Sequence, residues 1–200
     1  MLGCLAQGWA AAQVIEFENN GLKYQTLTRG GVTIMYAHLP TQTRDYAVMQ
    51  VSISNGSKTS WNFKPEDFAF RRGDGAEVKA EAARVVVGRM IDKGSRDEAI
   101  RLVTAYEASL YGMSRFRAPS GYEQRRQQML AELTSVKIKA AAAASAIAFA
   151  ATKLKPGEST DGAVFYATQG KPLGAGRLIV HAAGEVFEFN SEAPEGGKVP

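Results

Sequence analysis

The sequence has almost none of the residues that most enzymes and disulfide-stabilised proteins depend on. Cys4 is the only cysteine among 200 residues, so neither an internal disulfide nor a cysteine-based metal site can form. The two histidines, His38 and His181, both lie in predicted strands, and a zinc or catalytic-triad role needs them to converge with carboxylates. We therefore expect no metal, no cofactor and no catalytic residues, and a stability that comes from packing.

One alanine-rich segment is too short to cross a membrane. Residues 140–152 are uncharged for 13 residues, whereas a membrane-spanning helix needs about 20. Two alternatives remain for this segment. It packs as a helix against the rest of the protein, or it lies on a lipid surface with its flanking lysines at anionic headgroups.

Length and hydrophobic content place the chain among globular proteins. Two hundred residues with 45% hydrophobic content are enough to bury a core, and the length favours one domain or one domain with an appendage. The net charge of +4 is unevenly spread, because residues 82–155 hold 13 Lys/Arg against 6 Asp/Glu, a local +7, and the rest of the chain sums to −3. The basic character therefore belongs to one segment.

The first twelve residues have features of a truncated export signal. Residues 1–12 are apolar and small, and Ala10 to Ala12 before Gln13 fit an A-x-A cleavage site, although no basic residue lies within the segment. A second alternative is a lipidated Cys4, because residues 2–4 resemble the end of a lipobox. A third is a buried N-terminal segment. Either export route predicts a protein that acts outside the cytoplasm.

Two stretches, residues 13–81 and 154–190, have the pattern of antiparallel β-sheet. Apolar and polar residues alternate along short segments that are separated by turn-forming residues, which is typical of a β-sandwich or barrel. The first three segments follow one another closely and predict an antiparallel meander. Residues 191–200 predict a flexible tail. The predicted strands are residues 22–28, 32–38, 46–53, 60–63, 67–71, 163–167, 177–182 and 185–189.

Dipeptides that contain glycine mark the expected turns. Asn55-Gly56 is the strongest hairpin signal, because a type I′ turn needs positive φ at both central residues, and it predicts a hairpin that leads into residues 60–63. Asp74-Gly75 and Asp161-Gly162 also predict turns, since neither has the D-x-D-x-D-G spacing of a calcium loop. Ala183-Gly184 is expected to close the last hairpin.

Residues 82–153 are predicted to be a helical insertion. Ser95 and Ser120 each begin an S-x-x-E capping box, which marks a helix start. A break at residues 117–119 between two apolar stripes indicates an antiparallel helical hairpin. Residues 81–92 are expected to form a third helix, although their Val-Val-Val run equally favours a strand. The stripes are Ala99, Val103, Tyr106, Leu110 and Met113 in the first helix, and Met129, Leu133, Val136, Ala140, Ala143, Ile147, Ala150 and Leu154 in the second.

Five short segments, at residues 46–55, 65–68, 74–75, 154–159 and 162–165, share features with the strands of one known group. They resemble the V-x-V-x-N, f-x-L-x-x-x-dG and L-x-PG-x-x-x-G-x-V-x-F patterns of telokin-like, immunoglobulin-like domains of unknown function in bacterial envelope proteins and lipoproteins. The resemblance implies an extracytoplasmic immunoglobulin-like module with no assigned catalytic residues. The long helical insertion departs from the simplest members of that group.

Basic residues concentrate in the predicted helical insertion. If they share a face, their summed charge attracts an anionic surface, such as the membrane surface or an envelope protein. The alternative is a solvated helix surface that binds nothing. No nucleic-acid partner is expected, since the sequence has no recognised nucleic-acid-binding motif and export separates the protein from nucleic acid. The candidate surface residues are Arg115, Arg117, Arg125, Arg126, Lys137 and Lys139.

These observations combine into one expectation of fold and function. The fold is expected to be mainly β with an α insertion: an immunoglobulin-like antiparallel β-sandwich interrupted by a helical hairpin. The function is expected to be that of a non-catalytic, extracytoplasmic binding or envelope-structural module in a bacterium. The alternative is a hydrolase or metal-dependent enzyme with its site between the helical insertion and the sandwich loops. That alternative requires His38 or His181 to lie within hydrogen-bond reach of a carboxylate.

Overall fold

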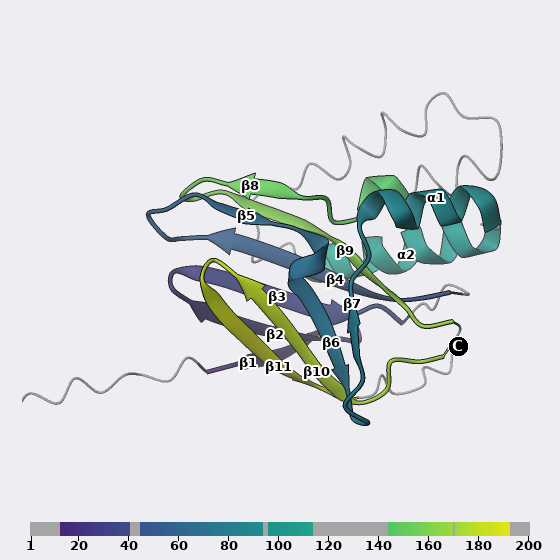
Figure 1. Ribbon diagram of the computed structural model, residues 1–200, viewed down its shortest axis with the longest axis horizontal. Helices are drawn as coiled ribbons and strands as arrows, with labels where there is room; N and C mark the ends of the chain where they lie inside the picture. Colours follow the sequence, from purple (N-terminus) through teal and green to yellow (C-terminus); the bar gives the residue numbers. More distant parts are fainter. Residues whose placement is uncertain (1–12, 41–44, 94–95, 114–143, 170, 193–200) are drawn as a thin grey trace, which may run out of the picture.

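The computed structural model describes residues 13–40, 45–93, 96–113, 144–169 and 171–192 (Figure 1). Within these residues the protein is mainly β, with antiparallel sheets and few helices. The strands form three sheets, and the helices lie together on one side of them (Figure 1). The prediction of a mainly β protein with an α insertion is confirmed at this level.

The largest sheet has five strands in the order β1-β2-β3-β4-β9. β2 (Leu22–Arg29), β3 (Val32–His38) and β4 (Tyr46–Asn55) follow one another as the predicted antiparallel meander. β1 (Ile15–Asn19) is an edge strand that the sequence pattern does not predict. β9 (Ser159–Ala167), from the far side of the insertion, pairs with β4. The two predicted β halves therefore meet in one sheet.

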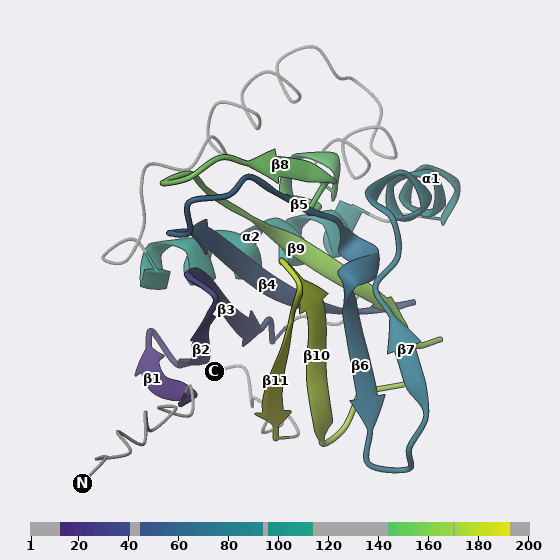
Figure 2. The same ribbon diagram turned by 60° about the vertical axis from the view of Figure 1, so that its left-hand side comes forward.

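The second sheet has four strands in the order β11-β10-β6-β7, which lie side by side in Figure 2. β10 (Gly176–Ala182) and β11 (Glu185–Ser191) form the predicted last hairpin. β6 (Phe68–Arg72) pairs with β10, so this sheet also joins segments from both sides of the insertion. β7 (Glu77–Lys79) is a short edge strand that pairs with β6.

A short two-stranded ribbon lies beside the larger sheets. β5 (Trp61–Phe63) pairs with β8 (Thr152–Leu154). The 3-10 turn η1 (Pro65–Asp67) follows β5 and leads directly into β6. Proline suits the first position of such a turn, because its missing N–H would have no partner there. The turn therefore holds the ribbon against the start of the four-stranded sheet.

The five-stranded and four-stranded sheets share one hydrophobic core. Met49, Val51 and Ile53 of β4 belong to it because side chains alternate between the two faces of a strand. Tyr46 and Val48, which alternate with them on β4, point to the opposite face and belong to a second cluster. Large aromatic side chains from several elements fill the shared core: Phe63, Phe68, Phe70, Phe149, Tyr166, Phe187 and Phe189.

Helices cover the other face of the five-stranded sheet (Figure 1). They are α1 (Ala83–Lys93), α2 (Arg96–Met113) and a turn of helix at residues 144–147. The Val-Val-Val run lies in α1, which confirms the helix and excludes the strand. The residues of α1 and α2 that are buried in the second cluster are Val86, Met90, Leu102, Ala105 and Tyr106.

The buried face of α2 differs from the predicted stripe. Leu102, Ala105 and Tyr106 are buried, whereas Val103 is only partly buried. The prediction placed this stripe in a helical hairpin, whose second helix lies mainly outside the described residues. The described residues show α2 packed on the sheet, which buries Leu102 and Ala105 beside the stripe. Of the two stripe residues whose burial the structure describes, Tyr106 is confirmed as buried and Val103 is only partly buried.

The prediction that the second helix continues to Leu154 is wrong. The helical turn ends at Ile147, Phe149 enters the core between the sheets, and β8 begins at Thr152. Leu154 faces the same core from β8, where it pairs with Trp61. Burial of Phe149 in the core and pairing of β8 with β5 together stabilise the chain more than continuation of the helix would. The last part of the predicted insertion is therefore part of the β structure.

The predicted turn at Asp161-Gly162 is also wrong, because both residues lie within β9. Gly162 pairs with Val51 of β4. A Cβ on Gly162 would lie 2.6 Å from the Cα of Phe149, and the backbone N–H of Phe149 donates to the carbonyl of Ala163 at 2.8 Å. The glycine is needed for this close approach of two backbones and not for a turn.

Asn55-Gly56 does not form the predicted hairpin. Asn55 is the last residue of β4 and is fully buried, and neither it nor Gly56 has a positive φ. The Asn55 side-chain amide donates to the carbonyls of Thr59 at 2.8 Å and Leu154 at 3.1 Å, and its oxygen accepts from the backbone N–H of Ser57 at 3.1 Å. These contacts fold the loop back toward β8, so β5 pairs with β8 and not with β4.

Several predictions concern residues outside the part that the structure describes. These are the export segment at residues 1–12, both capping-box serines, the break at residues 117–119 and most of the tail predicted at residues 191–200. At Ser191 the tail prediction is wrong, because this residue is the buried end of β11. The six basic residues of the candidate surface, from Arg115 to Lys139, lie there as well. Among the described residues, no helix is long and apolar enough to span a membrane.

Candidate functional site

A pocket of about 690 Å³ lies where the β5–β8 ribbon meets the β10–β11 hairpin. One wall is the ribbon and the segments that adjoin it, and the other wall is the tip of the hairpin. Asp67 of η1, which follows the ribbon strand β5 in the chain, also lines the pocket. The lining residues are Asn62, Phe63, Lys64, Asp67, Ala151, Thr152, Lys153, His181, Ala182, Ala183, Gly184, Glu185 and Val186.

The alternation of strand residues decides which side chains line the pocket. Phe63 and Ala182 are buried in the core directly beneath the pocket, so its base is apolar. Asn62 and Lys153 are opposite each other in the ribbon and are exposed. Val186, which pairs with His181 in the hairpin, is 37% exposed and adds an apolar patch at the rim. The pocket thus has an apolar base and a polar edge.

A tight turn places His181 and Glu185 at the pocket. Ala183 and Gly184 have φ values of 54° and 74°, the left-handed conformation that a two-residue type I′ turn needs. This is the turn that the sequence predicts. Glycine adopts this conformation without strain, and the alanine is held there by the paired strands on both sides. The turn makes the rim of the pocket a structured element and not a loose loop.

Asp67 is the partly buried carboxylate of the pocket. Its Oδ2 accepts the backbone N–H of Lys64 at 3.0 Å, which caps the 3-10 turn. Burial raises the pKa of the Asp67 carboxyl, while the hydrogen bond from Lys64 and the charges of Lys64 and His181 act in the opposite direction. The carboxylate is therefore close enough to both cationic groups to feel their charge, and it is committed to the turn that it caps.

The two lysines of the pocket are its least engaged charges. Lys64 and Lys153 are exposed, and among the described residues no carboxylate forms an ion pair with either. Glu185, the other acid of the lining, lies against Gly30 of the β2–β3 turn, where a Cβ would contact its carboxylate at 3.4 Å. Of the two acids, Asp67 thus has a hydrogen bond inside the fold, whereas the two ammonium groups are exposed.

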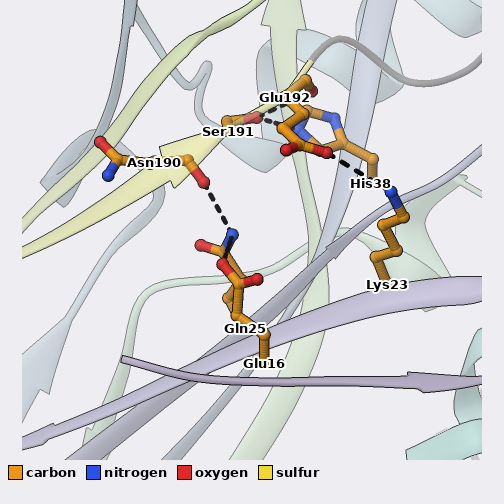
Figure 3. Close-up of polar contacts among 7 residues, drawn as sticks. All are labelled: Glu16, Lys23, Gln25, His38, Asn190, Ser191 and Glu192. Carbon is orange, nitrogen blue, oxygen red and sulfur yellow. Dashed lines mark hydrogen bonds and ion pairs between the residues drawn. The ribbon is translucent and has the colours of Figure 1, made fainter. Parts of the chain in front are cut away.

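His38 lies outside the pocket, at the seam where β3 meets the end of β11 (Figure 3). Its Nε2 is 2.5 Å from the Oγ of Ser191, and its ring packs edge-on against Tyr36 and Phe70. Burial lowers the pKa of His38 to about 4, so the imidazole is neutral at physiological pH. Ser191 is 4% exposed, which leaves no room for a substrate at its hydroxyl. The pair is therefore structural.

Further polar contacts lie along the seam between the two larger sheets (Figure 3). The Gln25 side-chain amide donates at 2.7 Å to both the carbonyl of Asn190 and the carboxylate of Glu16. Lys23 and Glu192 form an exposed ion pair at 3.4 Å, which contributes little to stability. Together with His38 and Ser191, these contacts hold the edge strand β11 beside β2.

A buried polar layer lies between α2 and the five-stranded sheet. The Tyr106 hydroxyl donates to Asp161 of β9 at 2.6 Å, and the Tyr24 hydroxyl of β2 donates to the backbone carbonyl of Ser109 at 2.9 Å. Gln50 of β4 lies between them, fully buried, and neither polar atom of its amide has a hydrogen-bond partner among the described residues. The sequence gives no signal for this layer, because its members come from distant elements.

A second polar cluster attaches α1 to the sheet. The Tyr46 hydroxyl donates to Glu81 at 2.7 Å and accepts from Arg89 at 3.0 Å, while Arg89 and Glu81 form an ion pair at 3.0 Å. Burial raises the pKa of the Tyr46 hydroxyl, and the bond to Glu81 raises it further. The cluster fixes the first helix of the insertion directly on β4.

The structure separates the residues that the sequence offered as site candidates. His181 lines the pocket, whereas His38 is buried in the seam, and the six basic residues of the candidate surface lie outside the described residues. No group of three or more His, Cys, Asp or Glu side chains within the described ranges is arranged to hold a metal ion. The sequence pattern does not predict the pocket, since its lining comes from five elements in three separate parts of the chain.

Comparisons with known proteins place the chain in no family. No protein-family model matches it, and no curated protein matches it. One solved structure, that of the yjhA protein from Bacillus subtilis, is similar with 11% sequence identity and a TM-score of 0.32, over 83% of this chain and 76% of that chain. A likeness of this size leaves the function to be argued from the residues of the chain itself.

Proposed function

We propose that this protein is a non-catalytic binding module, built on an immunoglobulin-like β-sandwich and working outside the bacterial cytoplasm, whose ligand occupies the pocket between the β5–β8 ribbon and the β10–β11 hairpin. The observation that carries the proposal is the pocket itself. Its volume of about 690 Å³ falls within the range of roughly 300–1,000 Å³ for small-molecule sites. An apolar floor with a few polar groups at the rim is also typical of such sites.

The walls of the pocket favour a preformed site. Phe63 and Leu154 of the ribbon and Ala182 of the hairpin all belong to the shared hydrophobic core. The elements that carry the rim residues are therefore anchored independently of any ligand. A preformed site avoids the cost of ordering loops when the ligand binds.

The chemistry of the pocket favours binding over hydrolysis. A hydrolase needs a nucleophile and a base within about 2.6–3.2 Å of each other. In the described part of the chain, the serine that contacts a histidine is Ser191, which is 4% exposed and remote from the pocket. Asp67, the carboxylate nearest His181 in the lining, caps a turn. These side chains support a recognition role for the pocket.

The immunoglobulin-like fold and the extracytoplasmic location rest on other observations. Two antiparallel sheets that share one core support the sandwich, and the motif resemblance supports the immunoglobulin-like group. The small residues before Gln13 support export. N-terminal sequencing of the protein from the periplasmic fraction, after expression from a longer start, is expected to begin at Gln13. A lipidated Cys4 selects the lipoprotein route, and an unprocessed cytoplasmic protein rejects export.

The pocket is tested by a fragment screen observed in two-dimensional NMR spectra of the full chain. Fragments that bind are expected to shift the amide signals of Asn62, Lys153 and residues 181–186. Val186→Trp should fill the rim and abolish these shifts. Glu188→Trp, two residues along the same strand and outside the pocket, is the matched control and should preserve them. Hits that cluster elsewhere, or no hits at all, reject the proposed site.

A further inference from the structure

The nitrogen-bearing side chains Lys64, Lys153 and His181 reach the pocket from three separate segments. Lys64 follows β5, Lys153 lies in the middle of β8, and His181 lies near the end of β10. All three are exposed and line the same pocket. Their distance along the chain means that the fold, and not a local basic run, brings them together.

The acids of the pocket do not cancel this charge toward the open space. Asp67 accepts the backbone N–H of Lys64, and burial raises its pKa. Glu185 lies against the glycine turn that joins β2 to β3. No carboxylate of the described residues, these two included, forms an ion pair with Lys64 or Lys153. Both ammonium groups can therefore contact an anion that enters the pocket.

The floor adds an apolar requirement to this electrostatic one. Above the buried Phe63 and Ala182, the exposed Val186 and Ala151 and the partly exposed Ala183 present hydrocarbon surface beside the two lysines. A ligand that consisted only of an anion would leave this surface exposed to water. An apolar body that covers it contributes in proportion to the area that it removes from water.

From this arrangement we infer that the pocket binds a ligand with one oxyanion group, a carboxylate or a phosphate, joined to an apolar body. Lys64, Lys153 and His181 contact the oxyanion, and the floor contacts the body. Lysine ammonium groups suit this role, because they form charge-assisted hydrogen bonds with carboxylate and phosphate oxygens. The inference rests on the proposed function, since it names the ligand class of the same pocket.

The test is a titration of the full chain, followed by calorimetry, with four probes that share a ten-carbon chain. Decanoate and decyl phosphate are expected to bind, whereas decanol and decyltrimethylammonium are expected to bind much more weakly. Each probe is used below its critical micelle concentration. Equal binding of all four probes rejects the oxyanion and leaves the pocket as a site. No binding of any probe, together with no hits in the fragment screen, rejects the proposed function as well.

Substitutions of single residues test whether the probes bind in the pocket. Lys64→Ala and Lys153→Ala should each weaken binding of decanoate about tenfold, the scale of one charge-assisted contact. Lys79→Ala, on the far edge strand β7, is the matched control and should change nothing. Asp67→Asn should strengthen binding, because it removes a negative charge while its amide oxygen still accepts the Lys64 N–H. Equal losses in the Lys79 variant, or a weaker Asp67→Asn variant that remains folded, overturn the inference.

A final arm distinguishes a free ligand from a lipid headgroup. If the oxyanion belongs to a lipid, the wild-type chain should sediment with phosphatidylglycerol vesicles, and the double variant Lys64→Ala/Lys153→Ala should not. If it belongs to a free molecule, decyl phosphate binds while the vesicles sediment both proteins equally or neither. Both results support the oxyanion class, and they differ in its source.

Discussion

Acid should destabilise this protein through His38 in a defined pH range. Burial lowers the pKa of the native imidazole from 6.5 to about 4. Between these values the unfolded chain binds a proton that the native protein does not, so the free energy of unfolding decreases as the pH falls from 6.5 toward 4. Below about pH 4 both states are protonated and the loss ends. Above pH 6.5 neither state is protonated and the group has no effect.

The size of this effect is large relative to the whole stability. The difference between a pKa of 6.5 and one of about 4 gives at most about 3.5 kcal/mol, at about 1.4 kcal/mol for each unit of pKa, and about 3 kcal/mol of this is lost by pH 4. Domains of this kind are stable by about 5–15 kcal/mol in total. Protonation of this one side chain can therefore remove a substantial part of the stability without changing any residue at the surface.

Urea unfolding at pH 7, 5.5 and 4 measures this effect by comparison of the wild type with His38→Gln. Carboxyl groups titrate in the same range, so the difference between the two proteins is the quantity of interest. The wild type should lose up to about 3 kcal/mol more than His38→Gln between pH 7 and pH 4. Ser191→Ala is the control, because it removes the hydroxyl at 2.5 Å but leaves the imidazole buried. It should be less stable at every pH and keep the wild-type slope.

One result would refute the reasoning about His38. If the wild type and His38→Gln lose stability in parallel over this range, the native imidazole takes up a proton as easily as the unfolded one. The seam between β3 and β11 would then have to be accessible to water, and the structural role of the His38–Ser191 contact would be wrong.

Three further predictions concern other parts of the molecule. Gly162→Ala should lower the free energy of unfolding by about 3 kcal/mol or more, since the new methyl group meets the Phe149 backbone at 2.6 Å; a urea midpoint within error of the wild type contradicts this close approach. Gln50→Leu should leave the melting temperature unchanged or raise it, because it removes a buried amide without partners among the described residues, each such group costing about 1–3 kcal/mol; a fall of several degrees indicates that the amide has a polar partner, such as buried water. Charge reversal in the basic segment should abolish co-sedimentation with anionic vesicles at low salt and leave the melting temperature nearly unchanged, whereas a wild-type protein that never sediments removes the membrane hypothesis. The residues to reverse are Arg125, Arg126, Lys137 and Lys139.

The strands and the helices that are described here follow mainly from local patterns. Alternation of apolar and polar residues identified β2, β3 and β4, and the Ala183-Gly184 dipeptide identified the turn of the last hairpin. Such patterns are readable because a strand has the same period of two wherever it lies. The pairing of the two β halves across the insertion was also predictable, since each half alone leaves strands that need a partner.

Tertiary contacts decided the features that local patterns misjudged. Asn55-Gly56 has the sequence of a hairpin turn, yet the buried Asn55 amide bonds to β8 and directs the chain there. Gly162 has the sequence of a turn, yet it admits the Phe149 backbone to the core. The contact of Asn55 joins residues roughly a hundred positions apart, and that of Gly162 joins residues about a dozen apart. A pattern that spans only a few residues contains neither contact.

The sequence by itself determined the class of the protein: an antiparallel β protein with a basic helical insertion, without the cysteines for a disulfide or a thiolate metal site. Only the tertiary structure decided that helices cover one face of the five-stranded sheet, that β11 closes the seam beside β3, and where the pocket lies. The rim of the pocket joins Lys64, Lys153 and His181, each unremarkable in its own segment. Local sequence sets the periodicity of a segment, but only packing of distant segments brings such side chains within reach of one ligand.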